Sequence, residues 1–155
     1  MARGRDTILE TESDSSSDES DTTAPAPAPA ARWYQFGKNG LAKDDVQART
    51  WYERGAAARD TKGVAMFGSY LLRGIGGPQN YALGLVNVTE AAGLGSEVGA
   101  YILGEAFFNG KWGLPEDPAR ARFWLKKVVD GECTHKQLGD KGKAKAVEWL
   151  RELDE

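Results

Sequence analysis

The sequence predicts an all-α protein: an α/α solenoid of about three two-helix repeats plus a C-terminal closing helix, preceded by a disordered acidic tail. Three observations lead to this prediction. The composition changes sharply near residue 31, the rest of the chain resembles itself at a period of 36 to 37 residues, and the apolar residues inside each period follow helical spacing. A length of 155 residues is that of one domain.

Residues 1–31 are predicted to be disordered, and residues 32–155 to form the folded domain. The first segment holds two basic and seven acidic residues and so carries −5, whereas the other 124 residues carry +2. All five Trp, five Tyr and five Phe lie beyond residue 31. A segment with so little apolar surface cannot offset the entropy of ordering, and the alternating Ala and Pro of residues 24–29 predict an extended spacer.

The part beyond residue 31 contains an internal repeat. A shift of 73 residues, or two repeat lengths, matches Gly37 with Gly110, Gly40 with Gly113, Asp44 with Asp117, Ala48 with Ala121, and Trp51 with Trp124. The middle copy matches at a shift of 36, as in Gly68 with Gly104, and one extra residue in the loop around Trp112 explains a later shift of 37. Similarity at a fixed period of this length is typical of a solenoid.

Each unit is predicted to contain two helices, because its apolar residues fall at i, i+3, i+4, i+7 and i+8. The first helix of the middle unit shows this spacing in Val64, Phe67, Gly68, Leu71 and Leu72, and the second helix of the third unit in Ala121, Trp124, Leu125, Val128 and Val129. The same pattern places Trp51, Trp124 and Trp149 in the core. Gly68 and Gly104 are expected where helices approach closely.

Turn residues are predicted to separate the two helices of a unit. Gly74 and Gly110 suit the left-handed residue that ends a helix, and the second helices begin with N-caps at Asp44, Asn80 and Asp117. The last helix is expected to begin with a capping box formed by Thr134 and Gln137. It is expected to break near residues 139–142 and to resume through Ala146, Trp149, Leu150 and Leu153.

The third unit resembles the Sel-1-like repeat, a relative of the tetratricopeptide repeat. The family pattern is met at Ala100, Leu103, Gly104, Phe107, Gly110, Gly113, Leu114, Asp117, Ala121, Trp124, Lys127, Val128 and Val129. The resemblance covers about residues 33–131, with the first unit lacking the start of its first helix and with Gly84 and Asn87 departing from the pattern. It implies a scaffold or adaptor that binds a protein or peptide on a concave face lined by the first helices.

Candidate contact residues are those on the first helices that leave the apolar face: Ser69, Tyr70, Arg73, Glu105 and Asn109. Asn87 interrupts an otherwise apolar helix face. We interpret it as a satisfied or partly exposed amide, the alternative being a ligand contact in a shallow pocket left by the missing Trp.

The sequence contains few residues that could support catalysis or hold a cofactor. Cys133 and His135 are too few for a closed zinc site, and they could form a catalytic pair only through their arrangement in space, so we expect no enzyme, cofactor or metal. A pI near 5.3 argues against a protein that binds nucleic acid or an anionic membrane. Without a long apolar segment or signal peptide, a cytoplasmic or nuclear location is expected, not secretion.

The charges suggest a second functional hypothesis, a small regulatory protein whose acidic tail makes the functional contact. Residues 119–151 hold nine basic and four acidic residues, a charge of +5 that opposes the tail, and they form either a solvated surface or a contact for an acidic segment. In the tail, Thr11, Ser15 and Ser16 each precede an acid by three residues, which resembles the sites of acid-directed kinases. Phosphorylation there would make the tail more negative.

Overall fold

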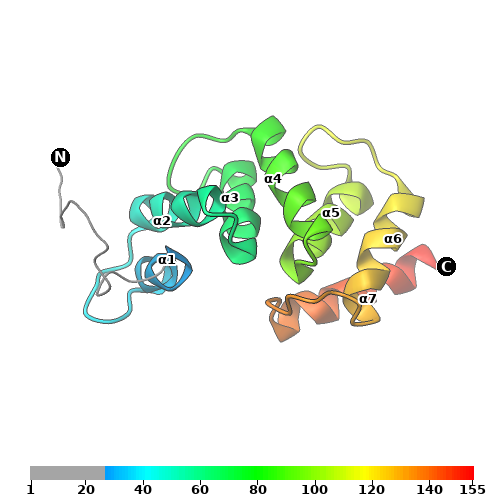
Figure 1. Cartoon of the computed structure of the whole chain (residues 1–155). Helices are drawn as coiled ribbons and strands as arrows, with labels where there is room; N and C mark the ends of the chain where they lie inside the picture. The colour runs from blue at the N-terminus through cyan, green and yellow to red at the C-terminus, as the bar shows by residue number, and fades with distance from the viewer. Residues whose placement is uncertain (1–26) are drawn as a thin grey trace.

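The computed structural model describes residues 27–155, with side chains from residue 29. Within these residues the chain forms seven helices and no strand: α1 (Pro27–Phe36), α2 (Asp45–Ala57), α3 (Thr61–Arg73), α4 (Tyr81–Gly93), α5 (Glu97–Asn109), α6 (Pro118–Val129) and α7 (Asp140–Leu153). Figure 1 shows the helices following one another across the molecule from α1 to α7. No helix in this part is long and apolar enough to cross a membrane.

Three helix pairs, α1–α2, α3–α4 and α5–α6, form the predicted repeats. Each first helix packs on its own second helix, and α3 and α5 also pack on the second helix that precedes them. The helix α7 packs on α6 and α5 just as α3 packs on α2 and α1, so α7 occupies the place of a fourth first helix and covers the end of the stack. The predicted all-α solenoid with a closing helix is therefore confirmed.

The stack curves toward the row of first helices. The helix α3 contacts both α1 and α5, and α5 contacts α7, whereas no contact joins α2 with α4 or α4 with α6. Helices that touch along one row and separate along the other place the touching row on the inside of the curve. The first helices α1, α3 and α5 therefore line the concave side.

The predicted caps are present at both kinds of helix end. Gly74 and Gly110 follow α3 and α5 in the left-handed conformation, with φ of 68° and 66°. The side chains of Asp44, Asn80 and Asp117 each accept a hydrogen bond from a backbone N–H of the first turn that follows. Asn80 follows Asp44 by 36 residues, and Asp117 follows Asn80 by 37. The extra residue therefore lies in the third repeat, as the sequence indicated.

The predicted start of the domain at residue 32 is wrong, because it falls inside α1. This helix begins at Pro27, and Ala30 and Ala31 are fully buried. Proline is compatible with the first turn of a helix, where its missing N–H costs no hydrogen bond, and alanine is the best helix former. The end of the Ala-Pro segment therefore supplies the start of the first helix, which the sequence pattern had counted as missing. The predicted tail up to residue 26 lies outside the described residues.

The predicted start of the last helix is also wrong. Residues 132–139 are not helical, and α7 begins only after Gly139. The backbone of His135 instead bonds to the turn before α5, donating to Gly95 O and accepting from Glu97 N, each at 3.0 Å. The N–H of Leu138 donates to the buried carboxylate of Glu97 at 2.9 Å. These hydrogen bonds pair backbone groups of the connector in a non-helical conformation. Thr134 and Gln137 therefore do not form a capping box.

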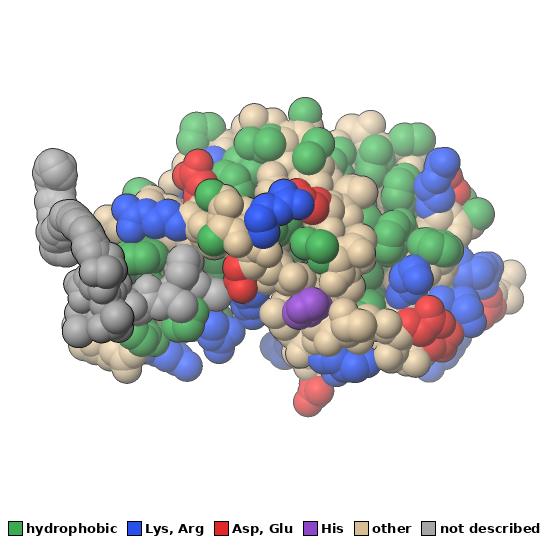
Figure 2. Space-filling model, viewed as in Figure 1, with side chains coloured by type: hydrophobic (Ala, Val, Ile, Leu, Met, Phe, Trp, Pro, Cys, Tyr) green, Lys and Arg blue, Asp and Glu red, His purple; other side chains and the backbone are tan. Residues whose placement is uncertain are grey.

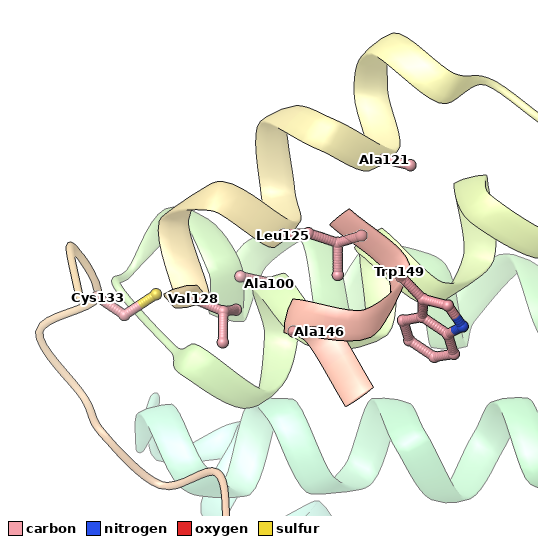
Figure 3. Packing of buried hydrophobic residues seen from close by; sticks show 7 residues of the cluster. All are labelled: Ala100, Ala121, Leu125, Val128, Cys133, Ala146 and Trp149. Atoms are coloured by element: carbon pink, nitrogen blue, oxygen red, sulfur yellow. The ribbon is translucent and has the colours of Figure 1, made fainter. Parts of the chain in front are cut away.

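Apolar clusters run along the whole stack, and the largest joins α5, α6 and α7. Figure 3 shows seven of its residues, with Trp149 and Ala146 of α7 facing Leu125 of α6. The ring of Trp149 stacks between Tyr101 and Phe108 at centroid distances of 5.5 and 5.4 Å. The core position expected for Trp149 is confirmed, whereas Trp51 and Trp124 pack on the clusters as half-buried rings.

Candidate functional site

The predicted contact residues lie along α3 and α5, but only two of the five are exposed. Arg73 and Asn109, at the ends of the two helices, are exposed, whereas Ser69 and Glu105 are each only 8% exposed. Tyr70 is buried against Tyr52 of α2, with ring centroids 5.4 Å apart. The expectation that all five leave the apolar face is therefore wrong for Tyr70, because its side chain points into the interface between repeats.

Glu105 forms the centre of a charged group on the concave side. Its carboxylate lies 2.7 Å from Lys111 Nζ and 3.4 Å from an Arg73 guanidinium nitrogen, so it joins α3 to the loop after α5. Arg73 also donates to the Ser69 hydroxyl at 3.2 Å, and the Asn109 amide donates to the backbone oxygen of Glu105 at 3.3 Å. Burial of a carboxylate is costly unless it is paired, and here two cations satisfy it.

Trp112 completes this group, although the repeat pattern indicated it only as part of the loop that holds the extra residue. It has a φ of 56°, a left-handed conformation that is strained for a bulky residue. Its half-buried ring packs on the apolar cluster around Leu72 and Ile102. The Arg73 guanidinium and the Lys111 ammonium lie 5.7 and 5.5 Å from the ring centroid. Strained residues of this kind tend to gather at functional sites.

We call this group the Glu105 cluster, made up of Ser69, Arg73, Glu105, Asn109, Lys111 and Trp112. Two cations share one carboxylate, so the cluster has an excess positive charge. The side chains of Arg73 and Lys111 remain 40% and 44% exposed. Arginine carries five N–H donors and lysine three, more than Glu105 and Ser69 can use. The cluster can therefore bind carboxylate or carbonyl oxygens beside an aromatic surface.

The geometry does not favour a nucleophilic role for Cys133. Its thiol is buried in the cluster formed by α5, α6 and α7 and points from the connector toward Val128 (Figure 3). Burial, with Glu97 as a smaller cause, raises the pKa of this thiol, so the protonated form dominates at neutral pH. His135 is exposed, and its ring contacts the Thr134 hydroxyl at 3.2 Å. Among residues 27–155, no group of three or more His, Cys, Asp or Glu could hold a metal.

Local acids pair most of the basic residues in the C-terminal part. Arg120 pairs with Asp117, Lys126 with Asp130, Lys127 with Glu132, Lys143 with Glu97, Lys145 with Glu148, and Arg122 with Asp154. Figure 2 shows blue and red side chains side by side over α6 and α7. This surface therefore offers an acidic segment less free charge than the net value of residues 119–151 suggested. The predicted phosphorylation sites Thr11, Ser15 and Ser16 lie outside the described residues.

Comparisons with known proteins agree with this architecture. The chain is similar to a Sel1 repeat protein from Oxalobacter formigenes, with 26% identity and a TM-score of 0.64 over 68% of this chain and 42% of that one. A protective antigen with an SLR fold, present in uropathogenic Escherichia coli strains, shares the fold at 20% identity and a TM-score of 0.62, over 83% of this chain and 29% of that one. The chain thus spans less than half of either protein. A search of curated proteins finds no match.

A family model described as the Sel1 repeat matches residues 30–60, 64–96 and 98–128. Each match covers most of one first helix and its second helix, so the three matches coincide with the three helix pairs of the structure. Together they cover more than half of the chain, and the chain belongs to the Sel1 repeat family.

Proposed function

We propose that this chain is a non-catalytic protein-binding module that holds a peptide segment of a partner protein on its concave side. Sel1 repeat proteins are in general protein-interaction scaffolds, and the three repeats and the curvature toward the first helices support the same use here. The partner segment lies across α3 and α5, and its polar groups contact the Glu105 cluster.

The observation that carries this proposal is the pairing of two cations with one carboxylate beside a strained tryptophan. If Arg73 and Lys111 served only to neutralise Glu105, one of them would be enough. The second cation leaves a positive charge on the side where the first helices converge. We infer that the partner segment carries a carboxylate there, next to an apolar side chain that packs on Trp112.

A selection from a random peptide library displayed on phage tests this proposal with the full chain as bait. Selected peptides are then measured against Arg73→Met and Lys111→Met, each of which leaves Glu105 one cation. Loss of a charged hydrogen bond should weaken binding about tenfold or more. Lys126→Met is the matched control, because Lys126 pairs with an acid in the same way but lies on the second helix α6.

Thermal melting of each variant separates a binding defect from unfolding. The proposal is contradicted if the selected peptides bind Arg73→Met, Lys111→Met and the parent equally well. It is also contradicted if Lys126→Met alone weakens them, because the contact surface would then lie on the second helices.

A second candidate function is that of a small regulatory protein whose acidic tail makes the functional contact. The local pairing of Arg120, Lys126 and Lys127 argues against the C-terminal part as the target of this tail. Three other basic residues, Arg32, Lys38 and Lys62, lie together at the opposite end of the stack. They favour the regulatory function.

A further inference from the structure

An open hollow of about 560 Å³ lies between the start of the stack and the connector that precedes α7. Three parts of the chain line it: α1 with the turn after it, the start of α3, and the connector. Its lining residues are Pro29, Arg32, Trp33, Lys38, Asp60, Lys62 and Gln137. Lys62 is 11 residues before Arg73 on α3, which is about 16 Å along the helix and close to three full turns of 3.6 residues. The two residues therefore lie on the same face of α3, and the hollow and the Glu105 cluster share the concave side.

The hollow is strongly basic. Arg32, Lys38 and Lys62 form no ion pair with any described residue, in contrast to the paired cations of α6 and α7. Asp60 is the one acid in the lining, and its carboxylate already accepts the N–H of Gly63 at 2.8 Å as the N-cap of α3. The three cations therefore face the hollow without a carboxylate dedicated to them.

Two further observations indicate a missing partner. Burial, followed by the nearby Arg32, lowers the pKa of Lys62, so an anion in the hollow would stabilise its charged form. The Oε1 atom of Gln137 is buried and accepts no hydrogen bond from the described residues. Such an acceptor is costly to leave unpaired, and a backbone N–H of an extended segment would satisfy it.

The sequence supplies an acidic segment within reach. Residues 14–21 contain Asp14, Asp18, Glu19 and Asp21 and no basic residue. Asp21 precedes the start of α1 at Pro27 by six residues, Pro29 in the first turn of that helix lines the hollow, and an extended chain spans about 3.3 to 3.6 Å per residue. Attachment through so short a linker corresponds to a millimolar effective concentration, so even weak ion pairs are enough for occupancy.

We propose that the acidic segment 14–21 of this chain binds in the basic hollow between α1, the start of α3 and the connector. Its carboxylates pair with Arg32, Lys38 and Lys62, and one of its backbone N–H groups donates to Gln137. Bound there, the segment occupies one end of the concave side and competes with a partner peptide that extends past α3. Phosphate on Ser15 or Ser16 adds about −1.5 to −2 charges each and strengthens the contact. The binding of segment 14–21 does not require the proposed function, whereas its competition with a partner peptide rests on that function.

Nuclear magnetic resonance of the full chain tests the proposal. The parent is compared at low salt with a triple variant carrying Asp18→Asn, Glu19→Gln and Asp21→Asn, which keeps the length of the tail and removes three charges. The indole N–H of Trp33 and the side-chain amide of Gln137 should shift between the two proteins. High salt should produce the same shift in the parent, because ion pairs of this kind are screened. Lys62→Gln should reduce the tail-dependent shift, whereas Lys126→Gln should not.

Identical Trp33 and Gln137 resonances in the parent and the triple variant at low salt would overturn the proposal. Tail-dependent shifts confined to Arg120, Lys126 and Lys127 would also overturn it, because the tail would then contact α6. Shifts that disappear on dilution would show that the contact joins two copies, which contradicts binding within one chain. Peptide selection on the triple variant tests the concave contact separately, so failure of one proposal leaves the other open to its own test.

Discussion

The middle and third repeats have the same backbone plan but fill their interiors differently. At equivalent positions of the second helix, α4 has Gly84 and Asn87 where α6 has Ala121 and Trp124. Both second helices nevertheless begin with a side-chain N-cap, and both follow a first helix that ends in a left-handed glycine. The caps and glycines therefore define the repeat, whereas the volume of its core side chains is free to vary.

The middle repeat compensates for its small residues by closer packing of its helices. A Cβ atom added to Gly68 would lie 3.0 Å from the backbone oxygen of Gly84 and 2.8 Å from a Val88 methyl carbon. In the third repeat, a Cβ on Gly104 would meet the side chain of Leu125 at 2.5 Å, with the nearest backbone atom 3.6 Å away. In the middle repeat a backbone atom of the second helix thus lies as close as its side chains do, whereas in the third repeat only the Leu125 side chain comes this close.

The largest expected difference between the two repeats comes from Trp124→Ala compared with Asn87→Ala. Trp124 packs on the cluster around Leu125 and on the cluster around Leu103, so its loss leaves a cavity between repeats. We expect a loss of about 3 kcal/mol in the free energy of unfolding, the low end for a tryptophan because the ring is half-buried. Asn87 donates to the Leu83 backbone oxygen at 2.9 Å, so Asn87→Ala should change stability by less than about 1 kcal/mol.

Urea unfolding followed by circular dichroism measures both changes. Equal losses for the two variants would show that Asn87 supports the core as much as Trp124 does. The structure already favours the simpler interpretation of Asn87, because its amide hydrogen is used by the backbone of its own helix.

The sequence predicted the parts of the fold that depend on local chemistry. Helix periodicity, N-caps such as Asp117 and left-handed glycines such as Gly110 act within a few residues, so a single sequence contains their signal. The errors arose where distant contacts decided the outcome. The connector of residues 132–139 bonds to the turn before α5 and to Glu97, and α1 buries its alanines against α2, neither of which a local pattern reports.

The candidate site was likewise predicted only where local helical spacing carries the signal, and not where distant contacts form it. Arg73, Glu105 and Asn109 were predicted because helical spacing places them along one side of the first helices. Trp112 was missed as a site residue, because its role depends on a loop that brings it against Arg73 from another repeat. One signal was available: at the shift of 73 residues that matches Gly40 with Gly113, Trp112 takes the place of Asn39. Both residues have a φ of 56° in the structure, and asparagine adopts this left-handed conformation more readily than a bulky residue does, so a tryptophan at this position indicates strain.

The glycines of the first helices should give the next largest difference. Gly68→Ala places a methyl group against the backbone of α4, which cannot move without shifting the repeat, so we expect a loss of about 1 to 3 kcal/mol. Gly104→Ala displaces the Leu125 side chain, and alanine favours a helix by up to about 1 kcal/mol, so its net loss should be smaller. Thermal unfolding by calorimetry compares the two. A larger loss at Gly104 would contradict the closer approach of α3 and α4.

A larger side chain at Gly104 needs a control at an exposed position. Gly104→Leu should destabilise by at least about 1 to 3 kcal/mol, because the site is filled by Leu125. Ser96 lies outside the apolar spacing of the first helices, so the sequence predicts that it tolerates leucine. This prediction is wrong, because Ser96 is fully buried and caps α5 by accepting the Gly99 N–H at 3.0 Å. Ala144 on the exposed side of α7 is the appropriate site for the control substitution to leucine.

The N-caps should give the smallest difference, because they are the feature that the two repeats share. Asn80 accepts the Leu83 N–H at 3.0 Å, and Asp117 accepts the Arg120 N–H at 3.1 Å. Replacing either by alanine should cost about 1 kcal/mol. Asp117 also pairs with the Arg120 side chain at 3.0 Å, but exposed pairs contribute only about 0 to 1 kcal/mol. We therefore expect Asn80→Ala and Asp117→Ala to lower the free energy of unfolding by amounts that agree within about 0.5 kcal/mol. The loss should be larger at Asp117, and the difference should decrease as the salt concentration rises.

Asp117→Asn keeps the cap and removes the charge, so in urea unfolding it should recover most of the stability that Asp117→Ala loses. If Asp117→Asn lowers the free energy of unfolding as much as Asp117→Ala does, charge rather than capping stabilises the start of α6. The two repeats would then not share the side-chain N-cap as a stabilising feature.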